Sequence, residues 1–186
     1  MKTLIALAFI PVALFAQQPE ADAGLDRLRA ALVEAFNKQD IEGTLSHLTP
    51  DVTVTWQNAE VNHGPAEVRA YYTRMMSGDK RIVREVKCDP KILGRQMHGD
   101  WAVSWGNLND HFTLMDGSDL PFNSTFTATT MKSGDKWLVT SFHVSVNAFE
   151  NPVLKLAVKK TAWWVGGGAL AAGLLGGFLL GRKKRA

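Results

Sequence analysis

The chain has 186 residues and a formal net charge of +3, and 46% of its residues are hydrophobic. The positive charge belongs to the two ends, because residues 19–150 hold 13 Lys and Arg against 18 Asp and Glu, a net charge of −5. This balance gives no indication of a nucleic-acid-binding surface, and a body of this length suits one compact domain. Cys88 is the only cysteine, which excludes an intramolecular disulfide and a thiolate metal cluster and indicates a small buried side chain on a strand.

The N-terminus has the layout of a secretory signal peptide. Lys2 precedes an apolar stretch at residues 4–15, and the small residue Ala16 follows it. Residues 1–17 are therefore predicted to be a signal peptide, and the body of the protein is expected to be exported. An uncleaved N-terminal anchor is the alternative, because the apolar stretch is long and contains Pro11.

The first part of the body predicts three helices and one strand. Apolar residues three and four positions apart in ADAGLDRLRAALVEAFNKQD, residues 21–40, predict an amphipathic helix. Asp40 is placed to cap a short second helix, and the alternating DVTVTWQN, residues 51–58, predicts a strand. The Gly-Pro pair at 64–65 begins the third helix, PAEVRAYYTRMMSG, because proline fits the first turn of a helix, and Gly78 ends it.

The rest of the body predicts four strands. The extended segments are RIVREVKCDPKILG, DWAVSWGNLNDHFTLMDG, LPFNSTFTATTMKSGD and KWLVTSFHVSVNAF. Turn signals separate them at residues 98–100, 116–117 and 133–135. Consecutive strands joined by short turns form an antiparallel meander, and three helices can cover only one of its faces. The predicted class is α+β.

The C-terminus contains a long uncharged segment. No residue from 161 to 181 is charged, and four basic residues follow. About 20 apolar residues are needed for a helix to cross a bilayer. The segment therefore predicts one transmembrane helix at 161–181, after a juxtamembrane linker at 150–160 and before a basic cytoplasmic tail at 182–186. This arrangement places the folded domain outside the cytoplasm, in a bacterial envelope. The alternative is a C-terminal sorting signal that a protease removes, which the mass of the mature protein would reveal.

The local sequences and the order of elements resemble a known family. LRAALVEAFNKQDIEGTLSHLTPDVTVTW, then NHGPAEVRAYY, then KWLVTSFHVSV, resemble the SnoaL-like branch of the nuclear transport factor 2-like superfamily over residues 22–149. The last segment is also similar to the association domain of calcium/calmodulin-dependent kinases, through Trp137, Phe142-His143 and Ser145. The resemblance implies a cone, in which a curved antiparallel sheet wraps around three N-terminal helices and leaves a pocket at its open end. Members include isomerases, dehydratases, cyclases and non-catalytic modules, so the fold does not settle the function.

The resemblance also allows catalytic positions to be compared. The superfamily's ketosteroid isomerase uses a carboxylate base at the end of the first strand, with a tyrosine and a protonated aspartate as oxyanion stabilisers. The matching positions hold Trp56 for the base, Leu32 for the tyrosine and Thr125 or Thr127 for the aspartate. All three roles are vacant, so steroid-isomerase chemistry is not expected.

Histidines leave an enzymatic alternative. Alternation places Trp105, Asn107, Asn109 and His111 on one face of their strand, and His143 lies on the last strand. His111 and His143 could form an acid–base pair of the dehydratase kind, with Asn109 as an oxyanion donor. The alternative is that each histidine is structural or lies on a subunit interface.

Other side chains are assigned more simply. Asp110 points away from His111 on a regular strand, so the adjacent pair is not a dyad, and His63 is expected to cap the third helix. The scattered histidines predict no metal site. The residues predicted to line a ligand pocket are Trp56, Trp105, Asn107 and Phe126.

These features favour a membrane-tethered domain that binds a small apolar ligand or serves as a dimeric interaction module. A homodimer is expected, with no cofactor and no nucleic-acid partner. The alternative function is an enzyme of the dehydratase, isomerase or polyketide-cyclase type, a lyase or isomerase that acts without a cofactor.

Overall fold

Three helices precede most of the sheet, as the sequence predicts. The computed structural model describes residues 13–149 and 151–183, with side-chain surroundings for residues 22–149 and 151–175. The helices are α1 (Ala13–Asn37), α2 (Ile41–Leu45) and α3 (Gly64–Tyr72), and a π-helical turn, η1 (Thr73–Ser77), extends α3. The Asp40 side chain caps α2 by accepting a hydrogen bond from the Gly43 N–H at 2.9 Å, which confirms the predicted cap. Residues 1–12 of the predicted signal peptide lie outside the described residues.

Seven strands form one curled sheet. They are β1 (Leu48–Thr55), β2 (Val61–His63), β3 (Val83–Lys87), β4 (Pro90–His98), β5 (Trp101–Leu114), β6 (Asp119–Ser133) and β7 (Lys136–Ser145). Their order in the sheet is β2-β1-β7-β6-β5-β3, and β4 also pairs with β5. The three predicted hairpin turns are present, with Gly99, Gly117 and Gly134 at positive φ.

The structure corrects the predicted sheet in two respects. The sheet is mixed, because β1 pairs with β7 in parallel whereas the other pairs are antiparallel. The connection from β1 to β7 includes most of the domain, so no hairpin forces them to be antiparallel. The segment RIVREVKCDPKILG also forms two strands, because β3 pairs with the end of β5 and β4 with its beginning. The short strand β2 was not predicted.

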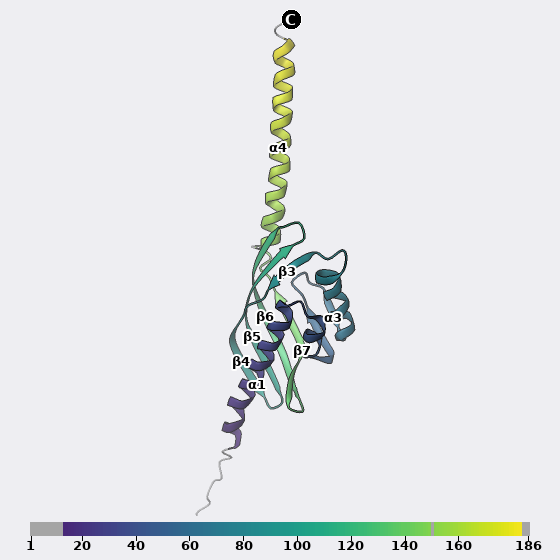
Figure 1. Cartoon of the computed structure of the whole chain (residues 1–186). Helices are drawn as coiled ribbons and strands as arrows, with labels where there is room; N and C mark the ends of the chain where they lie inside the picture. Colours follow the sequence, from purple (N-terminus) through teal and green to yellow (C-terminus); the bar gives the residue numbers. More distant parts are fainter. Residues whose placement is uncertain (1–12, 150, 184–186) are drawn as a thin grey trace, which may run out of the picture.

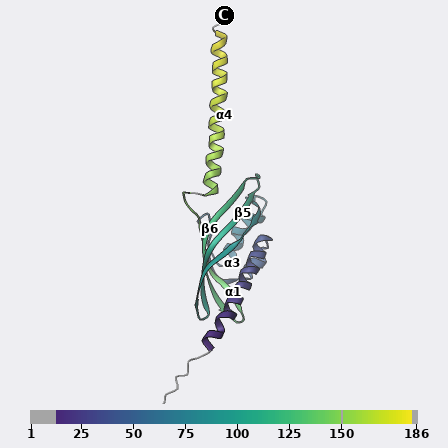
Figure 2. The ribbon, with the colours of Figure 1, turned by 90° about the vertical axis from the view of Figure 1, so that its left-hand side faces the viewer.

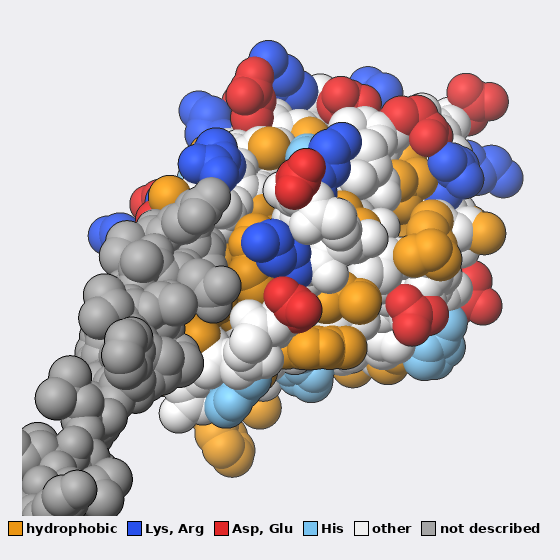
Figure 3. Space-filling model, turned by 90° about the horizontal axis from the view of Figure 1, so that it is seen from below, with side chains coloured by type: hydrophobic (Ala, Val, Ile, Leu, Met, Phe, Trp, Pro, Cys, Tyr) orange, Lys and Arg blue, Asp and Glu red, His pale blue; other side chains and the backbone are white. Residues whose placement is uncertain are grey.

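The helices cover the concave face of the sheet. Figure 2 shows α1 running alongside the strands of the sheet. The main core between them contains the buried side chains of Leu25, Leu28, Leu45, Val52, Val54, Trp56, Val68, Tyr71, Ala102, Trp137 and Val139. Seen from the end opposite α4, the surface shows Lys and Arg intermixed with Asp and Glu, with hydrophobic side chains exposed between them (Figure 3).

A long helix, α4 (Pro152–Lys183), projects from the domain (Figure 1). Lys160 contacts the turn between β5 and β6, where its Nζ lies 2.9 Å from the Asp116 Oδ2. Because α4 begins at Pro152, most of the predicted linker at 150–160 is helical. Within the part of the chain that the structure describes, no helix has both the length and the apolar character needed to cross a membrane. Residues 176–181 of the predicted span lie outside the residues whose side chains are described.

Candidate functional site

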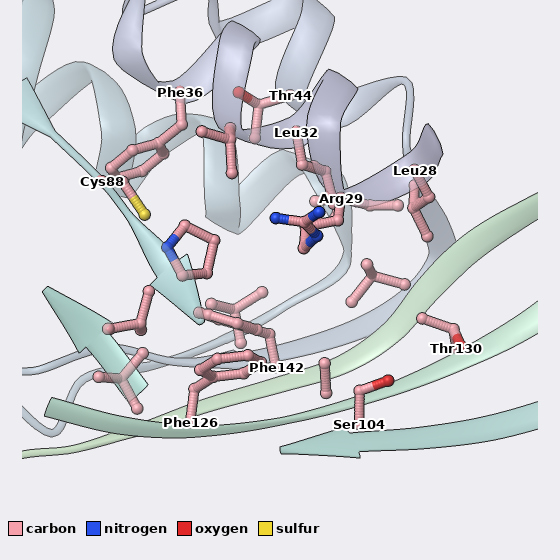
Figure 4. A pocket seen from close by; sticks show the side chains of 18 of the residues that line it. Leu28, Arg29, Leu32, Phe36, Thr44, Cys88, Ser104, Phe126, Thr130 and Phe142 are labelled. Atoms are coloured by element: carbon pink, nitrogen blue, oxygen red, sulfur yellow. The ribbon is translucent and has the colours of Figure 1, made fainter. Parts of the chain in front are cut away.

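A cavity of about 170 Å³ lies between α1 and the concave face of the sheet. Figure 4 shows helix residues Leu28, Leu32 and Phe36 facing Phe126 and Phe142 across it. Most of its other lining side chains are apolar too, among them Leu25, Val33, Val54, Trp56, Ile92, Leu108, Ala128, Val139 and Val144. Such a lining, with few polar groups, is typical of sites that bind small apolar molecules.

Strand β5 supplies the inner wall through alternate residues. Its buried positions are Ala102, Ser104, Gly106, Leu108 and Asp110, and the residues between them face outward. The inward residues are small or apolar until Asp110, which introduces a carboxyl group into an apolar wall. Period-two alternation therefore makes Asp110 the one charge-bearing side chain that β5 contributes to the cavity.

Asp110 is 4% exposed and only partly satisfied by hydrogen bonds. The Gln57 Nε2 donates to its Oδ2 at 2.8 Å, whereas its Oδ1 has no hydrogen-bond partner among the described residues. Burial raises the pKa of Asp110 to about 6, although hydrogen bonds from Cys88 and Gln57 act in the opposite direction. A carboxyl group in this state can give or accept a proton near neutral pH.

Cys88 lies beside this carboxyl group, between β3 and β4. Burial raises the pKa of the Cys88 thiol far above its ordinary value, and the negative charge of Asp110 is a smaller cause in the same direction. The thiol therefore stays protonated and is not a nucleophile, because only the thiolate is reactive. The sequence predicted a small buried side chain on a strand, whereas Cys88 is half-buried and lies in the connection between β3 and β4.

Trp56 is fixed at the cavity wall by two contacts. Its ring stacks on Tyr71 with centroids 4.4 Å apart, and its Nε1 donates to the Asn62 Oδ1 at 2.6 Å. Leu32 also lines the cavity. The two positions that match the isomerase base and tyrosine thus hold side chains without acid–base chemistry.

The predicted pocket residues divide between the two faces of the sheet. Trp56 and Phe126 line the cavity. Trp105 and Asn107 instead line a shallow hollow on the outer face, together with His143. Trp105 and Asn107 lie on the outer face because the even-numbered residues of β5 face inward. Gly94 on β4 makes room for the Trp105 ring, because a Cβ there would lie 2.2 Å from it.

The candidate catalytic residues all lie outside the cavity. Asn109, His111 and His143 are exposed on the outer face. The His111 Nε2 lies 3.4 Å from the Asp119 Oδ1, so its nearest acidic partner is also on the surface. Asp110 faces away from His111, as predicted. The structure therefore does not bring these residues to the carboxyl group of the cavity.

His63 does not cap α3 as expected. Its side chain makes no capping hydrogen bond, and its Nδ1 lies 3.2 Å from the Thr53 Oγ1. The backbone N–H of His63 instead donates to the Glu67 Oε2 at 2.7 Å, so a glutamate of the first turn satisfies the backbone donor of the N-cap residue.

The sequence interpretation missed four polar or charged residues of the site, Asp110 among them. Gln57 orients Asp110, and Arg29 and Arg95 line the cavity from α1 and β4. The small and apolar residues at even positions of β5 were the available signal for Asp110, since they identify the inward face. Among the described residues, no group of three or more His, Cys, Asp or Glu is arranged to hold a metal ion.

Residues 30–144 match the model of the SnoaL-like domain family, which is more than half of the chain. The protein therefore belongs to the SnoaL-like domain family. No curated protein matches the chain significantly.

Solved structures show the same fold. A candidate scytalone dehydratase from Novosphingobium aromaticivorans has a TM-score of 0.64 at 10% identity, over 72% of this chain and 88% of that one. A candidate dehydratase of the nuclear transport factor 2-like family from Streptomyces avermitilis has a TM-score of 0.60 at 19% identity, over 70% and 99% of the two chains. A candidate calcium/calmodulin-dependent kinase association domain from Thiobacillus denitrificans has a TM-score of 0.53 at 16% identity, over 66% and 94%. At these identities the likeness concerns the fold alone.

Proposed function

We propose that this protein is a SnoaL-like binding module that holds a small apolar ligand in the cavity between α1 and the sheet. The observation that carries the proposal is the cavity itself: about 170 Å³ of space lined mainly by apolar side chains, with an Asp110 Oδ1 at its wall that has no hydrogen-bond partner in the described part of the chain. An apolar cavity of about 150 Å³ is large enough to bind benzene. A ligand with one hydrogen-bonding group would satisfy Asp110 while its apolar part displaces little ordered water.

Filling the cavity should abolish binding. Ala128 lines the cavity from β6, so Ala128→Leu is expected to place three extra carbon atoms in the ligand's space. Binding of a small aromatic probe such as indole, followed by protein NMR, should weaken by at least tenfold in this variant. Thr127→Leu, on the outward side of the same strand, is the matched control and should bind normally. Equal binding by both variants would contradict the cavity as the site.

We further propose that the domain lies outside the cytoplasm, tethered by α4, and that two copies pair through the outer face of the sheet. The tether is supported by the uncharged segment at 161–181 and by the exposure of Trp163 and Trp164, which are 75% and 82% exposed. Pairing is supported by exposed apolar side chains on the outer face, where Leu93 is 65% and Trp105 37% exposed.

One preparation tests the tether and the pairing together. The full chain should stay with bacterial membranes after an alkaline carbonate wash, and protease added from outside should digest the domain. The same protein extracted in detergent should sediment as a dimer. Release by the wash would contradict the tether, and sedimentation as a monomer would contradict the pairing.

A second candidate function is a lyase or isomerase that acts without a cofactor. The buried carboxyl group of Asp110 favours it, because a pKa of about 6 suits a group that transfers protons. In this candidate the acid–base group is Asp110, whereas the catalytic roles of Asn109, His111 and His143 stay predictions for the outer face.

Proton transfer by Asp110 can be measured without knowing the substrate. The protein should catalyse exchange of solvent deuterium into the α-carbon of a small cyclic ketone, followed by NMR. Asp110→Asn should abolish the exchange, since an amide cannot accept the proton, whereas Asp51→Asn on β1 should keep it. Absence of exchange by the unmodified protein across a series of ketones would count against this candidate.

A further inference from the structure

The polar groups of the cavity lie at different positions along α1. Asp110 lies near the end of α1, because it neighbours Cys88, whose backbone is held by Asn37. The Asn37 Nδ2 donates to the Cys88 carbonyl at 3.2 Å, and the Cys88 N–H donates to the Asn37 Oδ1 at 2.7 Å. Arg29 also lines the cavity, seven residues before Phe36, which corresponds to about 10 Å along the helix.

Arg29 lies where the cavity meets solvent. Its side chain lines the cavity and is also 42% exposed, so it reaches both environments. Figure 4 shows its guanidinium group projecting from α1 into the space between the helix and the strands that carry Phe126 and Phe142. A charged side chain in this position can contact the solvent-facing end of a bound molecule.

The charge of Arg29 is poorly neutralised. Its Nε lies 3.9 Å from the Asp26 Oδ1, and the same oxygen accepts a shorter hydrogen bond, at 3.1 Å, from the Arg95 Nη2. Arg95 also donates to the Asp22 Oδ1 at 2.9 Å and to the Ser104 Oγ at 3.3 Å. Arg95 is therefore fully engaged. Arg29 keeps its two terminal nitrogens free of acceptors among the described residues.

We propose that the ligand of this cavity is a small monocarboxylic acid, whose apolar body fills the cavity and whose carboxylate binds Arg29 at the opening. The inference rests on the proposed binding function. A planar guanidinium group matches the two oxygens of a carboxylate. A single available cation suits one negative charge better than the two of a phosphate monoester.

The position of Asp110 sets the orientation of the acid. A ligand carboxylate placed inward would lie near a second carboxyl group in a medium of low polarity, which disfavours two negative charges. The acid group therefore faces outward, toward Arg29. The separation of about 10 Å between Arg29 and Phe36 along α1 leaves room for one ring with a short side chain. A hydroxyl group on the inner end of the ligand could donate a hydrogen bond to the Asp110 Oδ1.

The experiment compares an acid with its neutral analogue. Hydrocinnamate and hydrocinnamamide have the same apolar body and differ at the group that would meet Arg29. Calorimetric or NMR titration of the full chain in detergent at neutral pH should show the acid binding on the order of fivefold more tightly. Arg29→Gln should remove this preference because it weakens binding of the acid more than binding of the amide, and Arg29→Lys should keep part of it. Arg27→Gln, an exposed arginine on α1 that does not line the cavity, is the matched control and should keep the preference.

The outcomes separate this inference from the function on which it rests. Equal affinities of acid and amide for the unmodified protein, or a preference that persists in Arg29→Gln, would overturn the assignment of the acid and leave the binding cavity in place. If neither compound binds, and if Ala128→Leu leaves the affinity for indole unchanged, the binding function is overturned and this inference with it.

Discussion

Asp110→Asn is expected to make the protein more stable at neutral pH. The buried carboxyl group has a pKa of about 6 in the folded protein, against an ordinary value of 3.8. The folded state therefore binds this proton more tightly, and stability falls as the pH rises from about 4 to about 6. Two pKa units correspond to about 3 kcal/mol, so the full cost is present at pH 7 and absent at low pH. The asparagine variant does not titrate, and we expect it to gain about 1–3 kcal/mol at pH 7.

Urea unfolding at about pH 4 and pH 7 checks this expectation. The difference between the variant and the unmodified protein should be small at the lower pH and largest at the higher one. Asp51→Asn replaces an exposed carboxylate on β1 and should change stability by less than about 0.5 kcal/mol. A variant that is less stable at pH 7 would mean that the folded protein needs the carboxylate in its charged form. It would also contradict the raised pKa of the Asp110 carboxyl group in the folded protein.

Trp56→Ala is expected to be the most destabilising single change at the site. The side chain is 7% exposed, stacks on Tyr71 and is hydrogen-bonded to Asn62. Its removal enlarges a cavity that already exists and leaves the Asn62 Oδ1 without its buried donor. We expect a loss of about 3–5 kcal/mol in the free energy of unfolding.

Two further variants serve as controls for Trp56→Ala. Trp56→Phe keeps an aromatic ring that can stack on Tyr71 but lacks the N–H donor. The loss in the free energy of unfolding should therefore be limited to about 1–3 kcal/mol. Trp101→Ala removes a tryptophan that is 45% exposed on the outer face and should cost less than about 1 kcal/mol. Similar losses for Trp56→Ala and Trp101→Ala in urea unfolding would show that the stack on Tyr71 is not part of the stable core.

Local sequence signals predicted the elements well where a local physical cause decides them. The cap at Asp40, the proline in the first turn of α3 and the turn glycines each act within a few residues. They fixed the helices and most of the strands. The parallel pairing of β1 with β7 was not predictable in this way, because it depends on contacts between segments far apart in the chain.

The site itself was predicted only in part. Trp56 and Phe126 line the cavity between α1 and the sheet, whereas Trp105 and Asn107 lie on the outer face. Alternation shows that the residues of β5 divide into two faces, but it does not show which face meets the helices. The polar character of the residues around His111 suggested a site, although that face is exposed to solvent.

The sequence by itself determined the family, the order of the elements and the absence of the isomerase's catalytic side chains at Trp56 and Leu32. These features depend on residue identity and on short-range periodicity, which the chain carries directly. Only the tertiary structure decided that Asp110 faces the cavity, with an Oδ1 that has no partner among the described residues, and that the half-exposed Arg29 also lines the cavity. Both depend on the register of β5 and on how α1 lies across the sheet. Burial, and with it the pKa of a carboxyl group, is a property of that packing and not of the local sequence.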